Sequence, residues 1–275
     1  MRIREMLRQE KDVPRIELVA IIASALSTNT ERVYMNLGME LPPEACERIS
    51  ESLAQRKTGK PLAYIAGRRE FFSEEFFVDE RVLVPRPETE LLVEEALRTI
   101  VGKTSARALD MGTGSGIIGI VLARHGAHDV TCVDISHEAL LVARKNAERL
   151  GVGERTTHVC SDLFGAIRQG QRFDLITANL PYVSRPEWEG LMRDVRFEPY
   201  VALVGGARGT EVYERFIPAA ACYLREGGTV LCEVGGDAQA EYLEGVMRES
   251  GFRVRTEKDL EERKRVLIGS WKSSS

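Results

Sequence analysis

The stretch Ala108-Leu109-Asp110-Met111-Gly112-Thr113-Gly114-Ser115-Gly116-Ile117-Ile118 decides the fold of this 275-residue chain. It joins the end of an apolar strand to the start of an apolar helix through a loop that contains three glycines. Glycines let the backbone pass close under a ligand, while the free N–H groups of the helix start supply donors and the positive end of a dipole. The stretch therefore predicts a strand, a turn and a helix that together bind a nucleotide-like cofactor.

The same alternation of strand and helix continues after Glu88. Short apolar runs of strand character are separated by helical segments, which is typical of a parallel sheet with crossover helices. The expected strands are Ala106 to Met111, Val130 to Val133, Thr157 to Cys160, Leu175 to Ala178 and Thr229 to Glu233. We expect an α/β fold with a Rossmann-like, doubly wound sheet.

The first 85 residues have a different character. Apolar residues recur at helical spacing from Ile16 to Leu26, and a second helix is expected from Pro42 to Arg56. From Leu62 to Val84 the chain is rich in β-branched and aromatic residues with polar breaks, which suggests a β-hairpin. The expected division is a helical domain at 1–58, a β-hairpin linker at 59–86 and a sheet-containing domain at 87–275.

Composition limits the function classes. The net charge of −4 and the pI near 5.8 argue against a large nucleic-acid-binding face, which would be strongly basic. Five widely spaced cysteines favour buried thiols in a reducing compartment, and we expect no metal site. Neither a long apolar span nor a signal peptide is recognisable, so we expect a cytoplasmic protein without membrane contact.

The glycine loop alone leaves the cofactor open. Gly114 to Gly119 also satisfies the dinucleotide fingerprint, with Asp134 near the distance expected for a ribose hydroxyl. Asp110 and the closely spaced glycines nevertheless resemble the S-adenosylmethionine loop of class I methyltransferases. The predicted cofactor contacts are Gly112, Thr113, Gly114, Ser115, Gly116, Asp134, Asp162, Leu163 and Asn179.

Two of these predicted contacts have structural alternatives. Asp134 ends a strand at the ligand-binding edge and would hold the ribose hydroxyls, but it could instead cap the helix that starts near Ser136. Asp162 would accept a hydrogen bond from the adenine amino group while Leu163 packs on the ring, but it could be a turn residue.

The second informative stretch is Asn179-Leu180-Pro181-Tyr182, which follows an apolar strand. The Asn179 side-chain oxygen and the Leu180 carbonyl can accept the two N–H groups of a substrate amide or amino group. Pro181 fixes the turn, and Tyr182 would stack on the flat target group. We predict that these four residues position a planar nitrogen for methyl transfer, without a metal or a strong base.

The chain as a whole resembles the release-factor glutamine N5-methyltransferases, the HemK or PrmC family. The resemblance rests on the two stretches above and on several further segments. These are Gly59 to Gly67, Phe71-Phe72, Val84 to Glu90, Glu198-Pro199, Ala202-Leu203, Gly205-Gly206 and Glu233-Val234-Gly235 with Gln239.

The resemblance implies a substrate and a set of partners. Such enzymes use S-adenosylmethionine, yield S-adenosylhomocysteine, and methylate the glutamine of the Gly-Gly-Gln loop of bacterial peptide-chain release factors. It also implies an N-terminal domain that recognises the substrate, cofactor contacts at Gly112 to Gly116, Asp134 and Asn179, and a pocket wall at Pro85 to Glu90. We expect a monomer with no nucleic-acid substrate.

One residue departs from the family pattern. The tetrapeptide of the family is normally Asn-Pro-Pro-Tyr, whereas position 180 here is leucine. Asn-Leu-Pro-Tyr is the form found in adenine-N6 dimethyltransferases that act on ribosomal RNA, so adenine of RNA or DNA is the alternative substrate. A catalytically silent relative and a nicotinamide-binding module are further alternatives. The intact glycines and Asn179 argue against the first, and the run from Asn179 to Tyr182, which a nicotinamide enzyme would not need, argues against the second.

Overall fold

The computed structural model describes residues 1–103 and 105–271. The chain divides into two compact units, which are described separately. The first comprises Met1–Arg68 and Met192–Phe197, and the second comprises Arg69–Leu191 and Glu198–Ser275.

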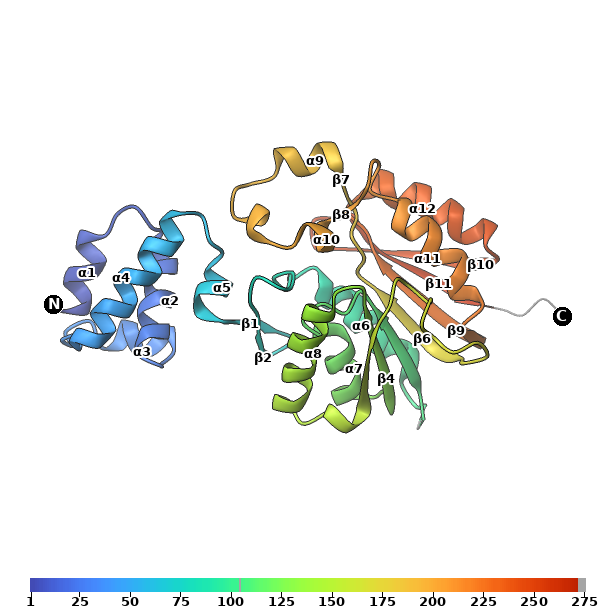
Figure 1. Cartoon of the computed structure of the whole chain (residues 1–275), viewed down its shortest axis with the longest axis horizontal. Helices are drawn as coiled ribbons and strands as arrows, with labels where there is room; N and C mark the ends of the chain where they lie inside the picture. Colours follow the sequence, from blue (N-terminus) through green and yellow to red (C-terminus); the bar gives the residue numbers. More distant parts are fainter. Residues whose placement is uncertain (104, 272–275) are drawn as a thin grey trace. The chain divides into compact units, whose positions relative to one another are not determined.

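The first unit is helical, and its helices gather around one apolar core (Figure 1). Both predicted helices are confirmed. The stretch around Tyr64, for which strand character was expected, is instead a short helix, because Pro61 opens it and Gly67 ends it in a left-handed conformation with φ 67°. The helices are α1 (Ile3–Gln9), α2 (Arg15–Ala25), α3 (Thr30–Met35), α4 (Pro43–Lys57), α5 (Leu62–Ala66) and the 3-10 turn η2 (Val195–Phe197).

The predicted hairpin is present, but it is shorter than expected. It pairs β1 (Arg68–Phe71) with β2 (Glu74–Phe77). Its two loop residues, Phe72 and Ser73, both have positive φ (52° and 60°). Such angles are typical of a two-residue hairpin turn whose twist matches that of the flanking strands. The backbone N–H and carbonyl of Phe77 bind the side chain of Asn146, which ties β2 to a helix of the second unit.

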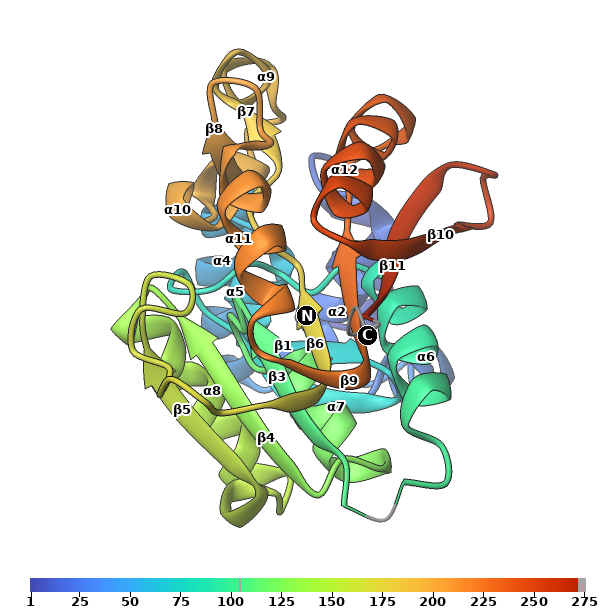
Figure 2. The same ribbon diagram turned by 90° about the vertical axis from the view of Figure 1, so that its right-hand side faces the viewer.

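The second unit is built on a seven-stranded sheet in the order β10-β11-β9-β6-β3-β4-β5 (Figure 2). The five predicted strands are confirmed and run parallel to one another. Two further strands at one edge, β10 and β11, were not predicted; β11 runs antiparallel to both of its neighbours, β9 and β10. The strands are β3 (Arg107–Met111), β4 (Asp129–Asp134), β5 (Thr156–Cys160), β6 (Phe173–Ala178), β9 (Leu224–Glu233), β10 (Phe252–Lys258) and β11 (Lys264–Trp271).

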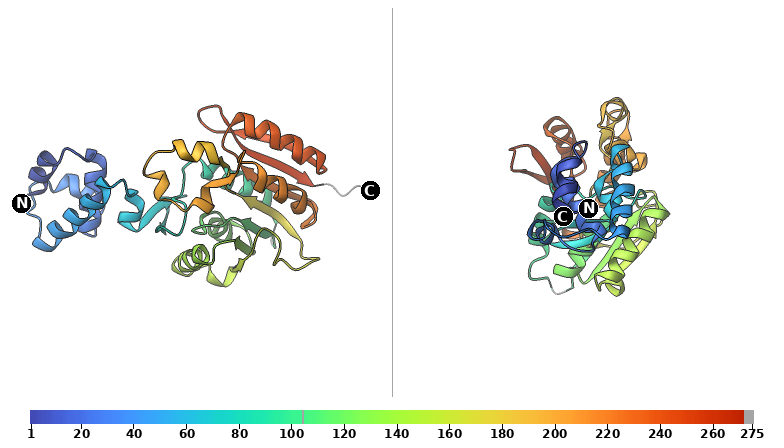
Figure 3. Two further views of the ribbon diagram at one scale, coloured as in Figure 1. Left: turned by 45° about the horizontal axis from the view of Figure 1, so that its top comes forward. Right: turned by 90° about the vertical axis from the view of Figure 1, so that its left-hand side faces the viewer.

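Helices cover both faces of this sheet (Figure 3). Neighbouring strand residues alternate between the two apolar layers: Ala108 packs with the first layer of helices and Leu109 with the second. The first layer is α6 (Thr89–Ile100), α7 (Ile117–His125) and α8 (His137–Arg149), and the second is α11 (Glu211–Ala221) and α12 (Asp237–Glu249). The fold is the expected doubly wound α/β sheet.

The remaining elements lie between β6 and α11, apart from η1. A two-stranded parallel ladder joins β7 to β8. The elements are η1 (Gly153–Arg155), β7 (Val183–Ser184), α9 (Arg185–Gly190), α10 (Tyr200–Leu203) and β8 (Val204–Gly206).

The cysteines agree only in part with the expectation of buried thiols. All five cysteines are free; Cys132 and Cys232 are buried, whereas Cys160 and Cys222 are exposed, so the expectation of buried thiols is wrong for these last two. Cys160 is exposed because it stands at the end of the edge strand β5.

Within residues 1–103 and 105–271 no helix is long and apolar enough to cross a membrane, and no cluster of side chains is suited to a metal ion.

Candidate active site

A cavity of about 210 Å³ opens at the carboxyl ends of β3, β4, β5 and β6. This is the edge at which doubly wound sheets bind ligands. Ten predicted site residues line it: Gly112, Thr113, Gly114, Ser115, Asp134, Asp162, Leu163, Asn179, Leu180 and Pro181. Two others, Gly116 and Tyr182, are not part of its wall.

The three glycines of the loop differ in what surrounds them. All have positive φ, at 74°, 54° and 86° for Gly112, Gly114 and Gly116. A Cβ at Gly114 would meet nothing within 4 Å, whereas one at Gly116 would lie 2.7 Å from Ile120 and 3.2 Å from Ala143. Gly114 is therefore the position where a ligand can approach the backbone, and Gly116 serves helix packing.

Asp110 stabilises the glycine loop through hydrogen bonds. Its buried carboxylate accepts hydrogen bonds from the Thr113 hydroxyl at 2.6 Å, the Thr177 hydroxyl at 2.9 Å and the Gly119 N–H at 3.1 Å. Burial raises the pKa of Asp110 to about 6 despite these donors. Because Asp110 does not line the cavity, its acidic character serves the shape of the loop.

Asp134 connects the glycine loop to the start of α8. One carboxylate oxygen accepts the Gly114 N–H at 2.9 Å, and the other accepts the Ser136 N–H at 2.8 Å. The cap of α8 is Ser136, whose hydroxyl accepts from Ala139 N–H at 3.2 Å. The alternative role of Asp134 as the helix cap is thus wrong. Burial raises the pKa of Asp134, so further donors from a ligand would favour its ionised form.

Asp162 has a partner that the sequence did not indicate. Its carboxylate accepts from Arg215 of α11 at 2.6 Å, and both side chains are more than half exposed. Arg215 and Val212, one helical turn apart, also line the cavity. Leu163, beside them, has a positive φ of 48°. An adenine contact from Asp162 therefore competes with this ion pair.

The loop from Asn179 to Tyr182 is held from several sides. The Asn179 side-chain amide donates to the Thr89 hydroxyl at 3.2 Å, and the Leu180 N–H donates to the Tyr213 hydroxyl at 3.0 Å. A Cβ at Gly205 would lie 2.2 Å from the Pro181 carbonyl oxygen, so glycine is required there. These contacts hold the loop from α6, from α11 and from the segment around Gly205.

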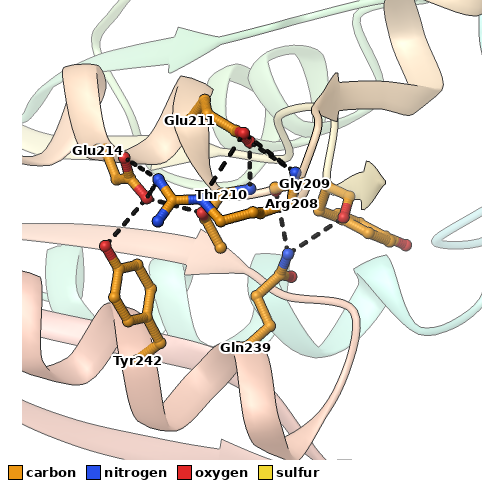
Figure 4. A network of polar contacts seen from close by, with 8 residues as sticks. Arg208, Gly209, Thr210, Glu211, Glu214, Gln239 and Tyr242 are labelled. Atoms are coloured by element: carbon orange, nitrogen blue, oxygen red, sulfur yellow. Dashed lines mark hydrogen bonds and ion pairs between the residues drawn. The ribbon is translucent and has the colours of Figure 1, made fainter. Parts of the chain in front are cut away.

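Gln239 of α12 connects three loops at this edge, and Figure 4 shows its side chain beside Gly209. Its amide nitrogen donates to the carbonyls of Tyr182 and Gly209, each at 3.1 Å, and its oxygen accepts the Gly235 N–H at 2.8 Å. The Tyr182 ring lies against Gly235, where a Cβ would be 3.0 Å away. The stacking of Tyr182 on a target group stays a prediction.

The run from Pro85 to Glu90 contributes part of the wall. Pro85, Arg86 and Thr89 line the cavity. Arg86 pairs with the buried carboxylate of Glu198 at 2.6 Å, and the other oxygen of Glu198 accepts the Val84 N–H at 2.9 Å. This pairing fastens the wall to the segment that precedes α10.

Comparison with known proteins decides the family. A PrmC N-terminal domain matches residues 1–67, and a methyltransferase domain matches residues 108–196. The release factor glutamine methyltransferase of Koribacter versatilis is 38% identical over 263 residues, which cover 94% of this chain and 92% of that protein. The protein of the same name from Chlorobaculum tepidum is 39% identical over 240 residues, 84% of this chain and 81% of that protein. The chain belongs to the release factor glutamine methyltransferase family.

Membership in this family makes the chain a methyltransferase and removes the nicotinamide-binding interpretation of its glycine loop. A solved structure supports the fold. The ribosomal protein L11 methylase of Lactobacillus delbrueckii subsp. bulgaricus superposes with a TM-score of 0.55 at 22% identity, covering 74% of this chain and 90% of that one. At that identity the likeness concerns the fold alone.

Proposed function

We propose that this methyltransferase transfers a methyl group from S-adenosylmethionine to the side-chain amide nitrogen of the Gly-Gly-Gln glutamine of bacterial release factors. Family membership supports the reaction class. The single observation that carries the proposal is that one cavity wall contains both the glycine loop and Asn179. A cofactor on the loop and an amide at Asn179 would thus meet in the same cavity.

The residues of the cavity fit the cofactor. Gly114 leaves room for a ligand against the backbone, and Asp134 offers carboxylate oxygens to ribose hydroxyls. Leu163 and Ile135 supply apolar surface for an adenine ring. When bound, S-adenosylmethionine supplies a methyl group on a positively charged sulfur.

The amide clamp accounts for the substrate. An amide nitrogen is a poor nucleophile because its lone pair is delocalised into the carbonyl. The Asn179 side-chain oxygen and the Leu180 carbonyl would accept its two N–H groups and aim the nitrogen along the methyl–sulfur axis. As the new carbon–nitrogen bond forms and the methyl–sulfur bond breaks, the nitrogen loses one proton, which passes to solvent.

We assign substrate recognition to residues 1–58, joined through residues 59–86 to the methyltransferase domain at 87–275. The match of the PrmC N-terminal domain to residues 1–67 supports a separate function for this part. The protein would act on the release factor as a monomer.

Mass spectrometry tests the proposal. The protein is incubated with S-adenosylmethionine and, in parallel, with a bacterial release factor, the same factor with its Gly-Gly-Gln glutamine changed to alanine, and unmodified ribosomal RNA. One methyl group on the glutamine peptide of the first sample alone supports the proposal. Methyl groups on adenine, with none on the factor, would overturn it in favour of the alternative suggested by Leu180.

A further inference from the structure

A buried carboxylate stands directly beside the amide clamp. Glu233 ends β9, and the register of β9 with β6 pairs Cys232 with Ala178. Glu233 therefore stands beside Asn179, the residue that directly follows β6. The Glu233 side chain is almost completely buried, and its Oε2 has no hydrogen-bond partner among the described residues. Buried carboxylates rarely leave an oxygen unpaired, so this one needs an explanation.

The Glu233 carboxyl, the Thr89 hydroxyl and the Asn179 amide form a cluster of polar groups beside the clamp. Thr89, fully buried at the start of α6, accepts the amide N–H of Asn179 at 3.2 Å. Thr89 and Asn179 both lower the pKa of the Glu233 carboxyl, so both polar groups lie close to it. A hydroxyl has a single proton. Because Thr89 accepts from Asn179, that proton is free to point toward Glu233.

The direction of the hydrogen bond between Asn179 and Thr89 determines which end of the Asn179 amide faces the cavity. An amide can turn over at little steric cost, since its oxygen and nitrogen have nearly the same size. Only polar partners distinguish the two orientations. With its N–H group held by Thr89, Asn179 presents its oxygen; turned over, it would present N–H groups to the N–H groups of the substrate.

We propose that Glu233 is a positioning residue which, in its ionised form, acts through Thr89 to keep the side-chain oxygen of Asn179 toward the substrate amide. This rests on the proposed function of the clamp. A protonated Glu233 is a weaker acceptor and can itself donate to the Thr89 oxygen, where it would compete with the Asn179 N–H. The inference therefore couples the protonation of one buried carboxyl to catalysis.

The charges around Glu233 place this coupling near neutral pH. Burial raises the pKa of Glu233 to about 7. Arg265 of β11 lowers that pKa, and Glu88 raises it. Burial raises the pKa of Tyr182 and of Tyr213, and the charge of Glu233 adds to the rise in both. The wild-type kcat should therefore fall on the acid side of a midpoint close to pH 7.

Two variants of Glu233 separate positioning from structure. Glu233→Met removes both the acceptor and the buried charge, and such replacements are often neutral or stabilising. We expect kcat on a release factor to fall by about 10- to 100-fold, with the cofactor dissociation constant within about 3-fold of wild type and an unchanged or higher melting temperature. Glu233→Gln, which cannot titrate, should lose the acid limb of the kcat profile.

Thr89 supplies a matched pair that keeps the inference testable if a Glu233 variant fails to fold. Thr89→Val preserves the shape and removes the hydroxyl, and should lower kcat about as much as Glu233→Met does. Thr89→Ser keeps the hydroxyl and should stay within about 3-fold of wild type. The double variant Thr89→Val/Glu233→Met should be no slower than the worse single variant, because the two residues act as one unit.

The outcomes distinguish the inference from the proposed function. If the wild-type protein methylates glutamine but Glu233→Met keeps full kcat, or Glu233→Gln keeps the acid limb, the positioning role is wrong. If the Glu233 and Thr89 variants lose cofactor affinity and stability in parallel with kcat, Glu233 is merely structural. If the wild-type protein leaves glutamine unmethylated, the proposed function fails first.

Discussion

The phenolic oxygen of Tyr213 accepts the backbone N–H of Leu180 at 3.0 Å and donates its own proton to the Glu233 carbonyl at 2.6 Å. This N–H exists only because residue 180 is not proline, the residue that the family pattern has at this position. All three residues are buried. Leu180 thus adds a buried N–H group that the family pattern lacks, and the Tyr213 hydroxyl accepts the hydrogen bond of this group.

This relationship predicts an interaction between positions 180 and 213. Tyr213→Phe leaves a buried N–H and a buried carbonyl without their partner, so it should lower the free energy of unfolding by about 1 to 3 kcal/mol. In a Leu180→Pro background the N–H is absent, and the same change should cost about 1 kcal/mol less. Urea denaturation of the four proteins measures the difference, and strictly additive effects would contradict the coupling.

Leu180→Pro alone keeps the carbonyl that would bind the substrate. We therefore expect its activity on a release factor to equal or exceed that of the wild type, measured as the initial rate of methyl incorporation. A large loss would mean that the leucine side chain, buried at 5% exposure, has a role that proline cannot replace.

Asn179→Ala should abolish methyl transfer while the cofactor dissociation constant stays within a few fold. The reason is that a clamp acceptor positions the transition state more than it holds the cofactor. Single-turnover assays measure the first quantity and calorimetric titration the second. Near-normal turnover by the variant would show that the clamp is assigned to the wrong residue.

Asp134→Ala should weaken cofactor binding by about 1 to 3 kcal/mol, because charge-assisted hydrogen bonds to ribose are lost. Asp162→Ala is the matched comparison. Its carboxylate is more than half exposed and already paired with Arg215, so a smaller loss is expected. Calorimetric titration of both variants tests the order, and a larger effect at Asp162 would reverse the assignment.

The sequence predicts the parts of the site that are local in the chain. The glycine loop and the run from Asn179 to Tyr182 each follow an apolar strand, and parallel strands end at one edge, so their meeting could be foreseen. Thr89 was predicted only as part of the pocket wall at Pro85 to Glu90. Its hydrogen bond with Asn179, and the roles of Arg215 and Tyr213, could not be foreseen, because these residues come from helices whose packing against this edge depends on tertiary contacts.

The errors in the predicted fold have similar physical causes. The edge strand β10 buries few of its side chains, so its sequence carries little apolar signal. The short helix α5 contains Tyr64 and Ile65, which favour strands locally, yet Pro61 and Gly67 set its start and end. Terminal residues of this kind decided the structure where intrinsic preference did not.

Glu233 should also make stability depend on pH. Its pKa is raised from 4.5 to about 7 in the folded protein. Its contribution to the free energy of unfolding is therefore fully present below pH 4.5 and is lost as the pH rises through about 7. Relative to Glu233→Met, the wild type should therefore lose about 3 kcal/mol over this range. The effect of Asp110 is present in both proteins and cancels in the comparison. Urea denaturation measures the free energy of unfolding of both proteins at each pH. A difference between the two proteins that stays constant from pH 4.5 to 8 would contradict the prediction.

Gly209 offers a test of how rigidly the clamp loop must be held. Its φ is +81°, and a Cβ there would lie 2.3 Å from the Tyr182 carbonyl oxygen. Gly227 has a similar φ of +72° but nothing within 4 Å of its Cβ position. Replacing either glycine by alanine should lower the free energy of unfolding by about 1 kcal/mol, because alanine is strained in the left-handed conformation. Only Gly209→Ala must also displace the clamp loop.

Gly227→Ala should thus keep full kcat, whereas Gly209→Ala should lower kcat by about 10-fold or more, since small displacements of positioning groups are costly. Equal kcat in the two variants, measured beside their melting temperatures, would show that the loop tolerates this displacement.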